Sequence, residues 1–148
     1  MKCNQWWRKR VIYPILAAAL FLGSCQFENF DERCAREAKE YTEQHCPLRI
    51  DPCTVLDSMT YASDKRTLQY YYTMEGLLDS TQILTPEVIA DFKKQLEGEI
   101  VNSVQLRKYK EERINFRYCY KSKKSGKTVF DLRFTPEDYE TAAKSEKQ

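Results

Sequence analysis

The sequence has few of the residues on which common catalytic motifs depend. Its 148 residues include a single histidine, His45, and no Gly-x-Ser-x-Gly segment that could hold a nucleophilic serine. A glycine-rich phosphate loop, a dinucleotide fingerprint and a Cys-x-x-Cys pair are absent as well. These absences argue against a serine hydrolase, a nucleotide-dependent enzyme and a thioredoxin-like redox protein. The sequence therefore assigns no catalytic residue, no metal site and no cofactor.

Glycine and proline are also scarce, with four and five residues respectively. Because these residues interrupt helices and strands, their scarcity predicts a chain of mostly regular structure. No internal repeat divides the sequence, so residues 25–148 are expected to form one small domain with a single core.

The first 24 residues have the order of charged and apolar residues that is typical of a secretory signal peptide. Four basic side chains and no acidic one lie within residues 1–10, and residues 11–22 are almost entirely apolar. This apolar run is shorter than the ~20 residues that a transmembrane helix requires. Acidic side chains such as Glu28 follow it, rather than a basic stop-transfer flank. Residues 1–24 are therefore predicted to be a cleaved signal peptide.

The junction Leu22-Gly23-Ser24-Cys25 resembles the lipobox of bacterial lipoproteins. In such proteins the bond before the cysteine is cut, and the cysteine becomes the lipidated first residue. The resemblance implies that Cys25 tethers the domain to a bacterial membrane. The expected location is the cell envelope, at the outer membrane on its periplasmic or surface side. An ordinary secreted protein with an unmodified Cys25 is the alternative.

The mature part is similar to small uncharacterised lipoproteins of Gram-negative bacteria. The similarity covers about a quarter of the chain and implies no activity. It rests on Cys46-Pro47, Ile50-Asp51, Thr54, Leu56-Asp57-Ser58, Leu68 and Tyr70-Tyr71-Tyr72.

Removal of the signal peptide reverses the sign of the net charge. The whole sequence has 24 basic and 22 acidic residues, and four of the basic ones lie within residues 1–10. The remaining 20 basic and 22 acidic residues give the mature chain a formal charge of −2. The basic pI of the precursor belongs to the signal peptide, so no nucleic acid is expected as a partner.

Six cysteines are present, of which Cys3 leaves with the signal peptide and Cys25 takes the lipid. The others form an even set in a compartment where disulfides persist, so two bridges are predicted among Cys34, Cys46, Cys53 and Cys119. A helix through positions 34 and 46 would place those two about 18 Å apart, which disfavours their direct pairing. Two sets remain open, namely Cys46–Cys53 with Cys34–Cys119, and Cys34–Cys53 with Cys46–Cys119.

Apolar side chains at steps of three and four predict helices over residues 26–44 and 84–106. In the second helix, Thr85-Pro86-Glu87 supplies a cap, a proline in the first turn and an acid near the positive end of the helix dipole. Alternating apolar residues predict four strands, over 53–61, 66–75, 112–121 and 127–134. The order helix-strand-strand-helix-strand-strand predicts an α+β fold, with a four-stranded, mostly antiparallel sheet and helices packed on one face. The strand order stays open.

Two features are candidates for contact with a partner. Four lysines gather around the predicted turn of the second hairpin and could meet an anionic glycan, a lipid or an acidic protein; they are Lys121, Lys123, Lys124 and Lys127. Tyr71 faces the opposite side of its strand from Tyr70 and Tyr72, and it could be a binding-surface aromatic.

The lack of a catalytic constellation favours a membrane-tethered binding or accessory module that engages another envelope component. The alternative is a thiol- or metal-dependent enzyme that uses His45 with the nearby Cys34, Cys46 and Cys53.

Overall fold

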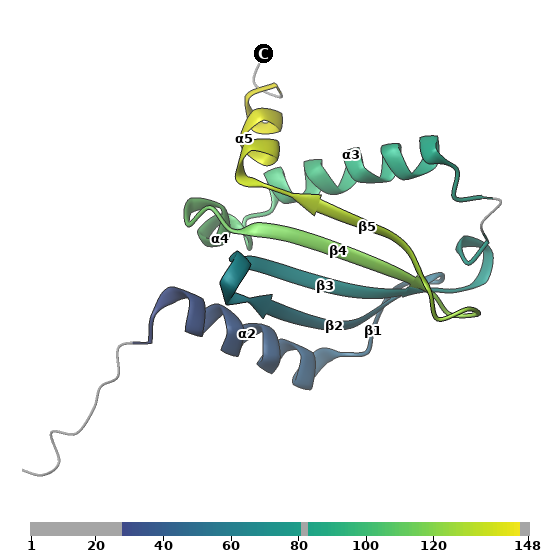
Figure 1. The fold of residues 1–148 in the computed structure, drawn as a ribbon, viewed down its shortest axis with the longest axis horizontal. Helices are drawn as coiled ribbons and strands as arrows, with labels where there is room; N and C mark the ends of the chain where they lie inside the picture. Colours follow the sequence, from purple (N-terminus) through teal and green to yellow (C-terminus); the bar gives the residue numbers. More distant parts are fainter. Residues whose placement is uncertain (1–27, 81–82, 146–148) are drawn as a thin grey trace, which may run out of the picture.

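The structure is a computed structural model that describes residues 28–80 and 83–145, so the predicted signal peptide and Cys25 lie outside it. It has an α+β fold with helices on one face of a five-stranded sheet (Figure 1). The elements in chain order are α2 (Phe30–His45), β1 (Leu48–Asp51), β2 (Thr54–Ala62), η2 (Ser63–Lys65), β3 (Thr67–Met74), η3 (Gly76–Leu78), α3 (Pro86–Asn102), α4 (Arg107–Glu111), β4 (Asn115–Ser122), β5 (Thr128–Phe134) and α5 (Pro136–Ser145).

The strands lie in sequence order, β1-β2-β3-β4-β5, and neighbours are antiparallel except for the parallel pair β3 and β4. The predicted α+β class and mostly antiparallel pairing are confirmed, but the sheet has five strands rather than four. The prediction missed β1 because its four residues are all exposed and lie between Pro47 and Pro52, and proline usually marks turns.

Both predicted hairpins are present, as β2–β3 and β4–β5. Gly126 in the second turn has φ +67°, the left-handed conformation that favours glycine. The parallel pairing of β3 with β4 follows from the chain between them, because α3 and α4 return it to the same end of the sheet.

The helix α2 begins at Phe30 because Asn29 caps it. The Asn29 side chain accepts a hydrogen bond of 2.8 Å from the Glu32 backbone N–H, and the Glu32 side chain accepts one of 3.0 Å from the Asn29 N–H. This capping box ends the helix on its N-terminal side. Of the predicted range, Glu28 and Asn29 precede the helix, and residues 26 and 27 lie outside the described part of the chain.

The helix predicted over residues 84–106 is shorter in the structure, and a separate short helix, α4, begins just after the predicted range. Thr85 caps α3 and Pro86 lies in its first turn, as predicted, but α3 ends at Asn102. The Lys110 ammonium stabilises this end by donating to three backbone carbonyls, at 2.8, 2.6 and 3.1 Å, those of Ile100, Val101 and Ser103. Because these carbonyls are satisfied from the side, the chain turns there and continues as α4.

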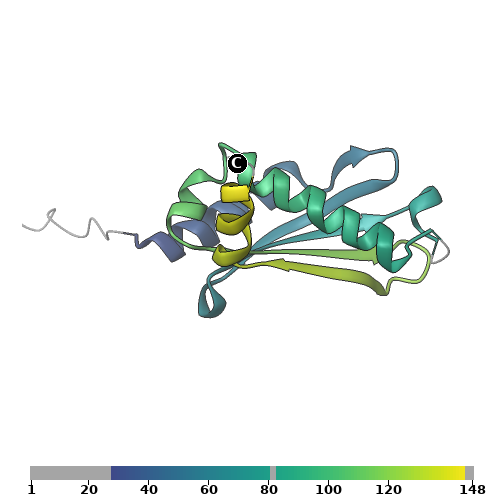
Figure 2. The ribbon, with the colours of Figure 1, turned by 90° about the horizontal axis from the view of Figure 1, so that it is seen from above.

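The core lies between the helices and one face of the sheet, as Figure 2 shows. Phe116 of β4 and Phe134 of β5 lie opposite each other, and both are fully buried. The helix α5 follows β5, and its Tyr139 meets Phe116 edge-on with 5.8 Å between ring centres. Within the described ranges, no helix covers the opposite face of the sheet. No helix there is long and apolar enough to cross a membrane.

Candidate binding surface

A row of stacked tyrosines lies on the helix-covered face of β3 and β4. Because the two strands are parallel and in register, Tyr70 lies beside Tyr118 and Tyr72 beside Tyr120. The ring centres in these pairs are 4.9 and 4.7 Å apart, and the interplanar angle is 11° in both. A further contact of 6.4 Å between Tyr72 and Tyr118 joins the pairs into one stack. These four residues are called the tyrosine strip below.

Neighbouring aromatic residues hold the strip in place. Phe130 of β5 stacks on Tyr120 at 4.6 Å, and Phe92 of α3 meets Tyr120 and Phe130 edge-on at 5.3 and 5.6 Å. Phe134 meets Tyr118 edge-on at 5.8 Å. A tyrosine side chain has few torsions to fix, so rings packed in this way are preorganised for binding.

The hydroxyl groups of the strip reach solvent although the rings are largely buried. Tyr118 and Tyr120 expose only 7% and 3% of their surface. Within the described part of the chain, none of the four hydroxyls has a hydrogen-bond partner, and no side-chain oxygen is buried without one. The hydroxyls must therefore meet water at the edge of the core.

The strip is polar at its tips and lies near an acid. Burial raises the pKa of the four hydroxyls, which keeps them protonated and able to donate at neutral pH. The exposed Glu99 carboxylate of α3 raises the pKa of Tyr72, Tyr118 and Tyr120 further. An acid beside aromatic rings favours a partner segment that carries a lysine or an arginine.

Two helices flank the strip. In Figure 1, α2 lies along the β2 side of the sheet and α3 along the β5 side, while β3 and β4 run between them. The contacts agree, since α2 packs on β2 and α3 packs on β5 and α5. The strip therefore lies between the two helices, on the face of the sheet that they cover.

The opposite, open face of the sheet pairs its own charges. Arg117 donates to both carboxylate oxygens of Asp131 at 3.0 Å and to the Gln69 side chain at 2.7 Å. Arg133 also lies 3.5 Å from Asp131. Tyr71, the predicted binding aromatic, lies on this face, where its hydroxyl donates to Gln69 at 3.2 Å. Groups that already have partners offer little to a ligand, so this face is the weaker candidate.

Ion pairs engage two of the four lysines that were predicted to meet an anionic partner. Lys121 lies 3.2 Å from Asp57 on the open face, and Lys123 pairs with Glu75. Lys124 and Lys127 line a crevice of about 610 Å³ beside η3, where the backbone N–H of Lys124 donates to Asp79 at 2.9 Å. Two of the four charges are thus neutralised, which weakens the case for an anion-binding cluster.

The four cysteines predicted to form disulfides are free thiols in the described chain. Cys34 is buried in α2 on the helix-covered side, whereas Cys119 faces the open side, 4.0 Å from the Thr128 hydroxyl. The sheet separates these two. Cys46 ends α2 and Cys53 lies beyond β1, so a strand of about 13 Å stands between them, well over the ~7 Å that a disulfide spans.

An enzyme built on His45 and these thiols finds no support in the arrangement. His45 lies exposed at the end of α2, with its ring 4.7 Å from that of Tyr41. Burial raises the pKa of Cys34 to about 11 and also raises that of Cys46, so both stay protonated and are poor nucleophiles at neutral pH. In residues 28–80 and 83–145, no three histidine, cysteine or acidic side chains are grouped to hold a metal ion.

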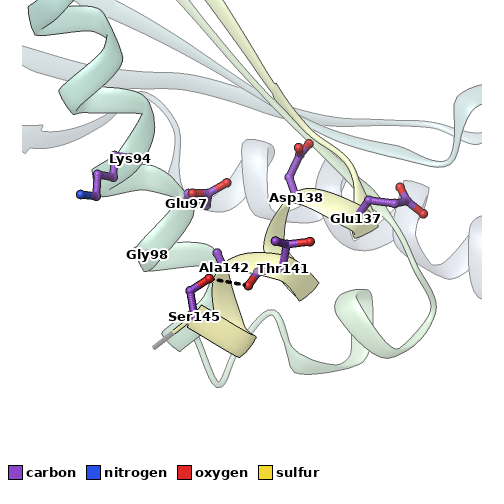
Figure 3. Close-up of a pocket in the computed structure, with 8 residues that line it drawn as sticks. All are labelled: Lys94, Glu97, Gly98, Glu137, Asp138, Thr141, Ala142 and Ser145. Carbon is purple, nitrogen blue, oxygen red and sulfur yellow. Dashed lines mark hydrogen bonds between the residues drawn. The ribbon is translucent and has the colours of Figure 1, made fainter. Parts of the chain in front are cut away.

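A crevice of about 510 Å³ lies where α3 crosses α5 (Figure 3). Its lining has mixed charges, with Lys94 and Glu97 on α3 and with Glu137 and Asp138 on α5. No aromatic side chain lines it, and the hydrogen bond drawn there joins the Ser145 hydroxyl to a carbonyl of its own helix. Its lining includes none of the large apolar side chains that are typical of ligand sites, so the tyrosine strip is the stronger candidate.

The sequence placed Tyr70 and Tyr72 on one face of their strand but did not predict the stack. Both strands carry tyrosines two residues apart, at 70 and 72 and at 118 and 120. This shared spacing becomes informative only once the strands are known to be parallel neighbours in register. The strand order had stayed open, so the signal could not be used.

Comparison with known proteins gives a family. Residues 29–130 match the family described as Domain of unknown function (DUF8479), and the chain belongs to that family. None of the curated proteins matches the sequence.

Three solved structures are similar in fold. EpsS, a pilotin of the Vibrio vulnificus type 2 secretion system, has a TM-score of 0.57 at 9% identity, over 74% of this chain and 90% of that chain. AspS, the type II secretion system pilotin of Vibrio cholerae, has a TM-score of 0.53 at 15% identity, over 73% and 90%. A Pseudomonas aeruginosa protein provisionally described as secreted has a TM-score of 0.58 at 12% identity, over 74% and 95%. Identities this low establish a shared fold alone.

Proposed function

We propose that this family member is a lipid-anchored accessory protein of the bacterial cell envelope, which binds a segment of another envelope protein over its tyrosine strip. The observation that carries the proposal is the strip itself, four stacked rings whose hydroxyls have no partner among the described residues. The fold shared with two pilotins supports an accessory role in the envelope. The lipobox-like sequence that ends at Cys25 supports a membrane tether.

Binding would use the strip in two ways. Apolar side chains of the partner would cover the rings and remove their remaining surface from water. The four hydroxyls and the Glu99 carboxylate would then select partners that present acceptors to the hydroxyls and a basic residue near α3. The stack is already formed in the free protein, so little side-chain entropy would be lost on binding.

Photo-crosslinking in living cells tests the binding surface. The photoreactive residue p-benzoylphenylalanine replaces Tyr72 in one strain and Tyr71 in another. The two positions are adjacent in sequence but lie on opposite faces of β3. We expect an adduct with an envelope protein from position 72 and none from position 71. Adducts from position 71 alone, or from both equally, would overturn the assignment of the strip.

A charge change refines the same test. Glu99→Lys leaves the tyrosine rings in place and reverses the charge beside them. We expect it to lower the yield of the position 72 adduct, because the partner's basic residue would then meet a like charge. Lys94→Glu, on the outer part of the same helix beside the α3–α5 crevice, is the control and should leave the yield unchanged.

The intact mass of the protein extracted from membranes tests whether Cys25 carries the lipid anchor. We expect a chain that starts at Cys25 and carries a diacylglyceryl or triacyl group, and we expect Cys25→Ser to abolish both the acylation and membrane retention. Alkylation of the denatured protein before and after reduction counts its disulfides in the same experiment. Four thiols that react without reduction would agree with the free cysteines seen here.

A further inference from the structure

One apolar side chain is held outward at the turn between α3 and α4. Val104 has 78% of its surface exposed, more than the other large apolar residues of the described chain. Hydrogen bonds on both sides fix the turn that carries it: the Ser103 hydroxyl accepts from the Leu106 N–H at 3.2 Å, and the Lys110 ammonium donates to the Ser103 carbonyl at 3.1 Å. Val104 is therefore presented by a built turn rather than by a loose loop.

This turn lies beside the start of α2. Val104 and Lys108 share a crevice of about 330 Å³ with Phe30 and Glu37 of α2. Tyr109 of α4 ties the two elements together, since its ring meets Phe30 edge-on at 6.1 Å and its hydroxyl donates to Glu37 at 3.1 Å. Figure 1 shows α4 at the same end of the molecule as the first turn of α2.

The length of chain back to Cys25 brings this end close to the tether. Glu28, the first described residue, is three positions after Cys25, and these three steps of the backbone span at most about 11 Å when fully extended. Phe30 is two residues further on and opens α2. A lipid on Cys25 would therefore hold the start of α2, and the turn beside it, within a short reach of the bilayer surface.

The side chains around Val104 fit an anionic bilayer. Arg107 and Lys108 are both exposed, on the same short helix that follows the turn. Lys108 makes no ion pair with any described residue, and Arg107 makes only an exposed one of 3.8 Å with Glu111. Basic residues near an apolar one are the combination that binds phospholipid headgroups while a side chain enters the interface.

We propose that the turn at Val104, with Arg107 and Lys108, is a second membrane contact that docks the domain on the anionic phospholipid surface to which Cys25 is anchored. The proposal rests on the lipid anchor proposed above. The docked turn fixes the orientation of the domain, and it leaves the opposite end, with η3 and the β4–β5 turn, pointing away from the membrane.

Tryptophan fluorescence tests this contact. The sequence has only Trp6 and Trp7, both within the predicted signal peptide, so the mature chain has none. Val104→Trp adds a single probe at the turn. The control is Leu77→Trp, which adds one on η3 at the opposite end, at a site of 77% exposure against 78% for Val104. Each lipidated variant is reconstituted in vesicles of phosphatidylethanolamine and phosphatidylglycerol, with and without brominated acyl chains.

We expect the Val104→Trp emission to shift to the blue and to lose intensity in brominated vesicles, while Leu77→Trp shows neither change. Adding Arg107→Glu and Lys108→Glu to Val104→Trp should reduce the quenching. Equal behaviour of the two tryptophans in protein whose mass shows the lipid would overturn the docking and leave the anchor intact. A mass without lipid would overturn the anchor, and the docking with it.

Discussion

On the helix-covered face of the sheet, Phe116 and Phe134 are fully buried, whereas the residues that alternate with them, such as Arg117 and Arg133, lie on the open face. The same strands thus carry two kinds of surface. The open face neutralises its own charges, because Asp131 accepts from Arg117 and lies next to Arg133. The covered face holds the core, yet the hydroxyls of its tyrosine strip have no partner in the part of the chain that the structure describes. The tyrosine strip of the covered face is therefore a better candidate for binding a partner than the charged side chains of the open face, which already pair with one another.

The largest expected difference between the two faces is in the free energy of unfolding that is lost when one aromatic side chain is removed from each. Phe116→Ala leaves a cavity in a fully buried site of β4 and should lower the free energy of unfolding by about 3–5 kcal/mol. Tyr71→Ala removes a partly exposed ring from the open face and should cost less than about 1 kcal/mol. Urea denaturation followed by circular dichroism measures both. Equal losses would show that the open face contributes to the fold as much as the covered one.

Two hydroxyl deletions on the covered face form a finer test. The Tyr139 hydroxyl donates to the Ile114 carbonyl at 3.2 Å in a buried site, so Tyr139→Phe should cost about 1 kcal/mol. The Tyr118 hydroxyl has no partner in the described chain, so Tyr118→Phe should change stability by less than about 0.5 kcal/mol. The same denaturation measurement applies. A loss for Tyr118→Phe as large as that for Tyr139→Phe would mean that its hydroxyl is not free for a partner.

Most of the fold could be predicted from local patterns. The Thr85-Pro86 start of α3 and the two hairpins depend on neighbouring residues, and each is present. Three features depend on contacts that are distant in sequence or on weak signals. The end of α3 is set by Lys110, β1 has four exposed residues and no buried side, and the parallel β3–β4 pair needs the path of α3.

The candidate site was less predictable for the same reason. Alternation placed Tyr70 and Tyr72 on one face, but the stack with Tyr118 and Tyr120 exists only through the parallel register. The lysines looked like one cluster in sequence, whereas Lys121 and Lys123 are paired with Asp57 and Glu75, acids far away in the chain. A cluster of lysines in the sequence does not show which distant acids will pair with them. Likewise, the spacing of tyrosines along a strand does not show which strand will lie beside it.

The stability that the Arg117–Asp131 ion pair of the open face contributes should depend on pH, whereas the stability from packing on the covered face should not. Hydrogen bonds from Arg117, together with its charge and that of Arg133, lower the pKa of Asp131 in the folded protein. A lowered pKa contributes stability above the unfolded pKa of about 3.9 and loses it as the pH falls through the folded value.

The variant Asp131→Asn should therefore cost up to about 1 kcal/mol between pH 5 and 7, and this cost should shrink below about pH 4 as the wild-type carboxylate takes up a proton. The cost of Phe116→Ala should stay constant over the same range, because no titrating group is removed. Urea titrations of both variants and the wild type at several pH values measure this difference. If the cost of Asp131→Asn persisted at the lowest pH, the open face would be held by packing rather than by charge, and the contrast between the two faces would fail.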